Sequence, residues 1–293
     1  MPEVQSQTII DPLTGSPVVI VGGRQTRPNN PTGMCPFCPG GLEAPEPYDV
    51  FSFVNRWPPL PGGRAEVVLY TSDHTGLFWT MGRSHIKKVI ELWEQRTVDL
   101  GNRPDVAYVL VFENRGAEVG ATIAHPHGQI YGFDFVPPKA RYELETDSCA
   151  LCTADPGDRL VSISESWRAW VPEAASWPYE LLIAPTEHFG DLPAAAKRRS
   201  DLADILADTL ARLDQLFDGP MPYMMWIHQR PPDGGDWPNA HVHFHISPLL
   251  RAPNTQRYVA AAEQGSGVYF NPVAPMDAAA AMRLLDGMPK ETP

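Results

Sequence analysis

The stretch IAHPHGQIYG, residues 123–132, holds the side chains of this sequence that are best suited to chemistry. His125 and His127 are two positions apart, so on a strand their imidazoles point to the same side. If His125 binds a metal ion, His127 stands beside it as a neutral imidazole, which is a competent covalent nucleophile. Gly128 leaves room for another group to approach the backbone, and Gln129 offers an amide donor suited to a phosphate oxygen. A His-x-His strand can equally supply two metal ligands, so this stretch alone leaves both interpretations open.

The four cysteines fall into two Cys-x-x-Cys pairs, CPFC and CALC. In a chain without a secretion signal, such pairs are more typical of metal or redox sites than of structural disulfides. Histidines follow both pairs at matching distances: His74 lies 36 residues after Cys38 (74 − 38), and His188 lies 36 residues after Cys152 (188 − 152). The words TSDH and PTEH around these histidines also match. The alternative is reduced cysteines in a core with satisfied surface histidines, and the repeated spacing argues against it.

The matching spacing indicates an internal duplication. In each half a cysteine pair is followed by a histidine, a helical pattern, a strand-like run and a histidine strand, HPH in the first half and HVHFH in the second. We therefore expect two halves, residues 1–140 and 141–293. The apolar positions at helical spacing are core residues rather than cofactor contacts. They are Met81, Ile86, Val89, Ile90 and Trp93 in the first half, and Leu202, Ile205, Leu206, Leu210, Leu213, Leu216 and Phe217 in the second.

Two sets of two cysteines and two histidines predict two tetrahedral zinc sites per chain. Zinc favours such sulfur and nitrogen donors, and four protein ligands make a closed, structural site. The predicted ligands are Cys35, Cys38, His74 and His125 for the first site, and Cys149, Cys152, His188 and His241 for the second.

Composition excludes several classes of protein. The net charge of −12 over 293 residues argues against a general nucleic-acid binder, which usually carries a basic patch. The N-terminal MPEVQSQTII lacks the basic and apolar regions of a signal peptide, and the sequence has no run of about 18 apolar residues that would predict a membrane span. We expect a cytoplasmic protein that contacts neither membrane nor nucleic acid.

The motifs together resemble the galactose-1-phosphate uridylyltransferase family of the histidine triad superfamily. DPLTG, CPFC, SDH, VFENRGAEVGATIAHPHGQIYG, WPYELLIAP and PLLR stand in that family's order, from Asp11 to about Glu263. The resemblance implies an α+β fold of two histidine-triad-like halves, with an antiparallel sheet or half-barrel flanked by helices. It also implies a homodimer in which a neighbouring subunit completes the active site.

The second cysteine pair is similar to the branch of the family that carries two zincs, which includes ADP-glucose phosphorylases. Other members lack that pair and hold a metal through a glutamate and histidines. Glu143 and His228 stand near the corresponding places here, and the presence of Cys149 and Cys152 argues against that arrangement in this chain.

The resemblance also implies a mechanism. His127 attacks the α-phosphorus of a nucleotide sugar, sugar 1-phosphate leaves, and a second sugar 1-phosphate takes the nucleotidyl group from the histidine. We expect the other ring nitrogen of His127 to donate to a backbone carbonyl, that of His125, and Gln129 to donate to a phosphate oxygen. The implied nucleotide and phosphate contacts are Arg27, Asn55, Phe112, Glu113, Asn114, Thr122 and Gln129; the implied hexose contacts are Arg257, Tyr258 and Glu263.

Three functions are therefore open. The first is a UDP-glucose–hexose-1-phosphate uridylyltransferase of galactose metabolism. The second is an ADP-sugar phosphorylase or a specialised nucleotidyltransferase of the same family. The third is a zinc-stabilised nucleotide-binding protein without catalysis, which the intact pair of His127 and Gln129 disfavours. The nucleobase, uracil or adenine, and the identity of the hexose are not readable from the sequence.

Overall fold

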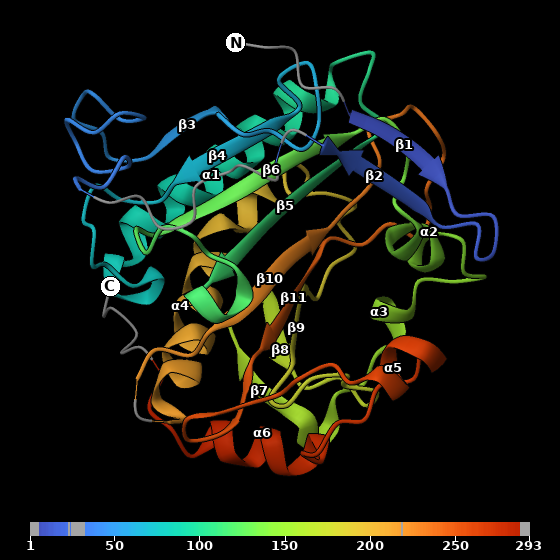
Figure 1. Cartoon of the computed structure of the whole chain (residues 1–293). Helices are drawn as coiled ribbons and strands as arrows, with labels where there is room; N and C mark the ends of the chain where they lie inside the picture. The colour runs from blue at the N-terminus through green and yellow to red at the C-terminus, as the bar shows by residue number, and fades with distance from the viewer. Residues whose placement is uncertain (1–5, 23, 25–32, 218, 288–293) are drawn as a thin grey trace.

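A nine-stranded antiparallel sheet organises the protein (Figure 1). The computed structural model describes residues 6–22, 24, 33–217 and 219–287. In spatial order the strands of this sheet are β3 (Phe51–Val54), β4 (Ala65–Leu69), β6 (His127–Phe133), β5 (Tyr108–Arg115), β10 (Tyr223–His228), β11 (His243–Pro248), β9 (Leu181–Pro185), β8 (Trp167–Trp170) and β7 (Leu160–Ile163).

The remaining elements surround this sheet. Two small hairpins are formed by β1 (Ser6–Ile10) with β2 (Pro17–Val21), and by β12 (Leu250–Ala252) with β13 (Thr255–Gln256). The α-helices are α1 (Arg83–Gly101), α2 (Pro138–Leu144), α3 (Ala150–Thr153), α4 (Arg199–Gln215), α5 (Ala261–Ser266) and α6 (Pro275–Arg283). Short 3₁₀ turns lie at Phe78–Met81, Ala117–Val119, Gly157–Arg159 and Ala196–Arg198.

The strand order of the sheet shows the same duplication as the sequence. The order β3-β4-β6-β5 in one half is repeated as β8-β9-β11-β10 in the other, and the halves meet where β5 pairs with β10. Phe112 lies opposite Trp226 in this central pair. The α+β fold with an antiparallel sheet flanked by helices is confirmed. The boundary near residue 140 stays a prediction, because one continuous sheet spans both halves.

The two long helices, α1 and α4, pack against each other on one face of the sheet (Figure 1). The predicted apolar stripes form this core: Ile86, Val89, Ile90 and Trp93 are buried in α1, and Leu202, Ile205, Leu206, Leu210 and Leu213 are buried in α4. Met81, Leu216 and Phe217 are partly buried against the same core. Among the described residues, no helix is long and apolar enough to cross a membrane.

Strand β6 separates the core from the predicted site. Alternate residues of a strand point to opposite faces. Gly128 and Ile130 are buried, and Ile130 belongs to the core under the helices, whereas His127, Gln129 and Tyr131 are only partly buried. The nucleophile candidate therefore faces away from the two long helices.

Candidate active site and metal-binding groups

His127, the first residue of β6, is held by its own strand. Its Nδ1 lies 2.7 Å from the carbonyl oxygen of His125, and because a carbonyl only accepts, Nδ1 must be the protonated nitrogen. The lone pair of the neutral ring is then on Nε2. This is the hydrogen bond expected from the sequence. His125 itself precedes the strand rather than belonging to it, and the ring of Phe37 packs edge-on against both imidazoles, 6.2 Å from His125 and 5.1 Å from His127.

Gln129 lies on the same face as His127, and its orientation is set by its neighbours. Its Oε1 accepts hydrogen bonds from the Tyr131 hydroxyl at 3.1 Å and from Asn55 Nδ2 at 3.4 Å. The amide nitrogen therefore remains as a donor. Phe112 lies directly opposite Gln129 on β5, with its ring 4.7 Å from that of Tyr131. The structure thus brings Asn55, Phe112 and Gln129 together beside the nucleophile candidate.

Of the other predicted contacts on this side, Asn114 shares the face of Phe112, Thr122 lies in the loop before β6, and one lies outside the described residues. Asn114 is two residues beyond Phe112 on β5, so it shares that face of the sheet. Thr122 is partly buried in the loop that leads into β6. Arg27, the predicted phosphate-side arginine, is outside the described residues.

Glu113 faces the other way, contrary to its predicted substrate contact. It lies between Phe112 and Asn114, so strand alternation directs it to the helix-covered face. It is 5% exposed, and its Oε1 accepts a hydrogen bond from the hydroxyl of Tyr223 at 3.0 Å. The sequence motif groups Glu113 with Phe112 and Asn114 because the three are consecutive. On a strand, however, consecutive side chains point to opposite faces of the sheet.

Arg257 and Glu263, two of the predicted hexose contacts, are bound to each other inside the protein. They form a buried ion pair, and the Arg257 guanidinium lies 4.4 Å from the centre of the Trp177 ring. Glu263 also accepts hydrogen bonds from the backbone amides of Ala260 and Phe270, each at 2.9 Å. The Phe270 amide, more than any other contact, lowers the pKa of this carboxyl. With its oxygens engaged in this way, Glu263 serves to hold the segment that carries Tyr258.

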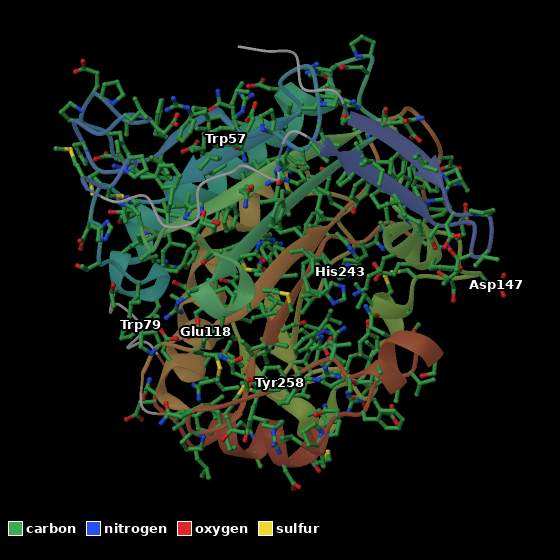
Figure 2. All side chains as sticks on the ribbon, viewed as in Figure 1. Trp57, Trp79, Glu118, Asp147, His243 and Tyr258 are labelled. Atoms are coloured by element: carbon green, nitrogen blue, oxygen red, sulfur yellow. The ribbon has the colours of Figure 1, made fainter. Side chains whose placement is uncertain are left out.

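Tyr258, in contrast, is 75% exposed and available to a ligand. It does not lie beside the nucleotide-side residues of its own chain. Figure 2 shows Tyr258 well separated from Trp57, whose backbone amide donates to Asn55 Oδ1 at 2.8 Å. One chain therefore leaves the predicted hexose segment apart from the predicted nucleotide contacts.

Both predicted Cys-Cys-His-His sets are brought together and could hold a metal ion. In each set the candidate ligand atoms all lie within 4.8 Å of one another, and the four cysteines are free thiols. In the first set Cys38 Sγ lies 3.5 Å from His74 Nδ1 and 3.6 Å from His125 Nδ1. His125 Nε2 donates to the carbonyl oxygen of Thr71 at 2.7 Å, which leaves Nδ1 as the ligand nitrogen.

The second set repeats this geometry in the other half. Cys152 Sγ lies 3.0 Å from His188 Nδ1, and Cys149 Sγ lies 3.4 Å from His241 Nδ1. Burial, with a smaller effect from neighbouring His188, lowers the pKa of His241 to about 4. A neutral imidazole is the form that binds metal.

A third group contradicts the expectation that the second cysteine pair replaces the glutamate and histidines. Glu143, His228, His243 and His245 also place their ligand atoms within 4.8 Å of one another. Glu143 Oε2 lies 2.6 Å from His228 Nδ1 and 3.3 Å from His243 Nε2. Burial would raise the pKa of Glu143, but hydrogen bonds from the three histidines hold it well below its usual value.

The two neighbouring groups coexist because they use different positions of one run. His241 precedes β11, whereas His243 and His245 alternate onto its open face, and His228 lies opposite His243 on β10. The spacing of two residues between the histidines of HVHFH already predicted that they share one face of the strand. The position of Glu143, near the end of α2, had no comparable signal because it depends on how that helix packs.

The duplicated sheet, the tethered His127 and the amide of Gln129 together define a transferase built from two histidine-triad-like halves. Sequence profiles agree: residues 58–137 match the galactose-1-phosphate uridyl transferase N-terminal domain, and residues 138–261 match the C-terminal domain. The chain belongs to the galactose-1-phosphate uridylyltransferase family.

Individual relatives extend over most of the chain. A galactose-1-phosphate uridylyltransferase of Thermotoga maritima is 36% identical, covering 93% of this chain and 96% of the relative. A solved uridylyltransferase structure is 31% identical, with a TM-score of 0.86, over 96% of this chain and 98% of that one. An ADP-glucose phosphorylase from Arabidopsis thaliana, solved with bound ADP-glucose, is 25% identical, with a TM-score of 0.75, over 96% of this chain and 100% of that one.

The buried pair can be distinguished from a substrate contact by its effect on stability. Arg257→Ala leaves the Glu263 carboxylate buried without its partner, so it should lower the melting temperature of the ligand-free protein. Tyr258→Ala changes a side chain that is 75% exposed, so it should leave the melting temperature unchanged. Calorimetry of both variants checks this. Equal melting temperatures for both variants and the parent protein would instead favour a substrate contact for Arg257.

Proposed function

We propose that this chain exchanges a UMP group between UDP-hexose and hexose 1-phosphate, in the manner of UDP-glucose with galactose 1-phosphate. The observation that carries the proposal is the 2.7 Å hydrogen bond from His127 Nδ1 to the carbonyl oxygen of His125. It favours the tautomer in which Nε2 carries the lone pair, on the face that carries the Gln129 amide. Family membership and the Thermotoga maritima relative support the same activity.

The reaction divides into two displacements at phosphorus. Nε2 of His127 forms a bond to the α-phosphorus of UDP-hexose, the bond to the bridging oxygen breaks, and hexose 1-phosphate leaves. A second hexose 1-phosphate then attacks the nucleotidyl-histidine and restores the ring. No general base is needed, because imidazole is largely neutral near pH 7. As the nitrogen lone pair is consumed, the ring becomes cationic, and the carbonyl of His125 accepts from it more strongly.

Gln129 supports the phosphorus centre in both displacements. Its Oε1 is occupied by Asn55 and Tyr131, so its amide nitrogen can donate to a non-bridging oxygen on which charge builds. Removing a donor of this kind typically costs about 3 kcal/mol of transition-state stabilisation. Asn55, Phe112, Asn114 and Thr122 are the proposed nucleotide and phosphate contacts from this side.

A second copy of the chain completes the site in this proposal. Tyr258 is exposed and lies apart from the nucleotide-side residues of its own chain, so a hexose bound near His127 needs contacts from elsewhere. A homodimer with two-fold symmetry would supply Tyr258 to its partner's site and receive the same in return.

Zinc is the metal that we propose for both cysteine-containing groups. Zinc–sulfur and zinc–nitrogen bonds of ordinary length in a tetrahedron separate sulfur from nitrogen by about 3.5 Å. The observed separations of 3.5 and 3.6 Å around Cys38, and of 3.0 to 3.6 Å around Cys149 and Cys152, fit that geometry. Zinc bound by four protein ligands supplies folding free energy rather than catalysis. The group of Glu143 and three histidines offers nitrogen and oxygen donors that suit a further divalent transition-metal ion.

The second candidate function is that of an ADP-sugar phosphorylase. The second cysteine-containing group favours it, because the sequence resembles the two-zinc branch in that respect. The structural likeness to the ADP-glucose phosphorylase supports it further. This reaction would use the same nucleotidyl-histidine and differ only in the acceptor, inorganic phosphate instead of a sugar 1-phosphate.

Elemental analysis should locate the metals group by group. We expect two equivalents of zinc in the cysteine-containing groups. Cys149→Ser with Cys152→Ser should lose one, and Cys35→Ser with Cys38→Ser should lose the other and destabilise the first half, because zinc binding is coupled to folding. His245→Ala, which alters only the third group, should keep both. A zinc content unaffected by the cysteine changes would remove zinc from those groups.

Covalent labelling tests the chemistry. Incubation with UDP-glucose labelled at the α-phosphorus, without acceptor, should leave an acid-labile and base-stable label on the protein. Galactose 1-phosphate should release it, and His127→Ala should take up none and lose turnover by several orders of magnitude. Release by inorganic phosphate but not by sugar 1-phosphate would favour the phosphorylase. Persistent labelling of His127→Ala would place the nucleophile elsewhere, with His243, the corresponding repeat position, examined first.

Mixing two inactive variants tests the shared site. His127→Ala lacks the nucleophile, and Tyr258→Ala lacks the proposed hexose contact. If each site combines both residues from different subunits, a dimer of one variant with the other holds one intact site. Random reassociation should then recover about a quarter of the parent activity. No recovery, with mixed dimers demonstrated by light scattering and affinity tags, would contradict a site shared between subunits.

A further inference from the structure

We propose that Tyr70 is a positioning residue for the nucleophile: its hydroxyl, buried beside Glu113 beneath strand β6, supports Gly128 and so fixes the backbone from which His127 projects. The inference rests on the proposed function, since it takes His127 as the reacting group. It assigns a role to two buried side chains, Tyr70 and Glu113, that lie on the helix-covered side of the sheet.

Tyr70 follows β4 directly and contacts the chain on both sides of His127. Its backbone amide donates to the carbonyl oxygen of Pro126 at 3.2 Å, one residue before the nucleophile. Its hydroxyl lies under Gly128, one residue after it. Leu69, the neighbour of Tyr70, is the residue that pairs with His127 across the sheet. Tyr70 therefore contacts the residue before His127 through its backbone and the residue after it through its side chain.

The hydroxyl occupies the space that a side chain at position 128 would need. A Cβ atom built on Gly128 would lie 2.1 Å from the Tyr70 oxygen and 2.9 Å from the ring carbon that carries it. It would also lie 3.1 Å from the carbonyl oxygen of Phe112. Glycine is thus required for the approach of a tyrosine from the core, on the face opposite the phosphate-binding side.

The ring of Tyr70 has little freedom to move away. It is 1% exposed and packs edge-on against Phe78 and Trp93, with ring centres 5.5 and 5.6 Å apart. Its own carbonyl oxygen accepts a hydrogen bond at 2.7 Å from Nε2 of His85 in α1. The position of the hydroxyl is therefore set by the core and by α1.

Glu113 lies beside this hydroxyl and has one oxygen available for it. Tyr223 donates to Oε1, whereas neither Oε2 nor the Tyr70 hydroxyl makes a well-formed hydrogen bond within the described part of the chain. The two groups are close enough that the charge of Glu113 adds to burial in raising the pKa of Tyr70. The other charged groups facing Glu113 are Arg115 and Asp214, which are paired with each other at 2.8 Å.

The Glu113 carboxyl changes its protonation state near neutral pH. Burial, opposed by Arg115, raises the pKa of this carboxyl to about 7. The ionised form can accept from both tyrosine hydroxyls, and the protonated form gives up one of these acceptor positions. Ionisation should therefore strengthen the hold on the Tyr70 hydroxyl as the pH rises through about 7.

The first measurement is the rate at which the full-length protein takes up label from UDP-glucose in a single turnover. Tyr70→Phe should slow it by about tenfold or more, because small misplacements of a nucleophile are costly, while the KM for UDP-glucose stays within about twofold. Tyr142→Phe, a tyrosine that is 79% exposed, is the matched control and should label normally.

The decisive comparison is a pair of variants that should compensate. Gly128→Ala places a methyl group against the Tyr70 hydroxyl and should label more slowly than Tyr70→Phe. Combining the two removes the closest contact, at 2.1 Å, and leaves contacts of 2.9 and 3.1 Å that small shifts can relieve. The double variant should therefore label faster than Gly128→Ala alone. Independent effects, with the double variant slower than either single one, would overturn the proposal.

The second measurement is the pH dependence of the same step. The ratio of the labelling rates of the parent protein and Glu113→Gln should increase between pH 6 and 8, about the pKa near 7. The stabilisation contributed by protonated Glu113 is lost as the pH rises from the ordinary carboxyl range to the raised pKa of about 7, because over that interval the folded state binds the proton more tightly than the unfolded state. The advantage of the parent over Glu113→Gln in free energy of unfolding should therefore decrease.

Glu118→Gln, an exposed glutamate labelled in Figure 2, serves as the control for charge removal. A rate ratio that does not change with pH would overturn the link between Glu113 and His127. Failure of the parent protein to label at all would instead refute the proposed function. The two failures are therefore distinguishable in one set of experiments.

Discussion

The hydrogen bond from the ring of His127 to the carbonyl oxygen of His125 is the interaction on which the site depends. It joins the proposed nucleophile to the backbone of a metal-ligand candidate. His125 is in turn fixed by its Nε2, which donates to Thr71 and leaves Nδ1 facing Cys38. The first Cys-Cys-His-His set and the His127 ring are therefore positioned together through His125. A change that moves His125 would therefore also alter the ring orientation of His127 and the nitrogen on which its proton lies.

The second half keeps this hydrogen bond and changes its surroundings. His243 Nδ1 donates to the carbonyl oxygen of His241 at 2.6 Å, as His127 does to His125. The positions of Gly128 and Gln129 are taken by Phe244, whose ring packs against Trp93 and Trp167 in the core, and by His245. A bulky residue replaces the glycine, and a candidate metal ligand replaces the amide donor. The same strand geometry therefore presents the proposed nucleophile in one half and a candidate metal-binding group in the other.

The sheet determines which neighbours in the sequence can act together. Phe112, Glu113 and Asn114 are consecutive, yet the middle one belongs to the core and the outer two to the open face. Burial of a carboxyl among tyrosines is costly unless its oxygens find donors. Here the hydroxyl of Tyr223 donates to Oε1, and the hydroxyl of Tyr70 lies close to the same carboxyl. The substrate face and its support are thus built from the two sides of the same strands.

Features that depend on residue type and local spacing could be predicted before the fold was known. These are the duplication, the two Cys-Cys-His-His sets, the helical stripes of α1 and α4, and the tethered His127 beside Gln129. Contacts between distant segments could be seen only in the folded chain. Glu143 contacts His228 across 85 residues, and Arg257 forms a buried ion pair with Glu263. The physical reason is that periodicity fixes the face on which a side chain lies, whereas its partner is chosen by strand order and by the packing of each helix end.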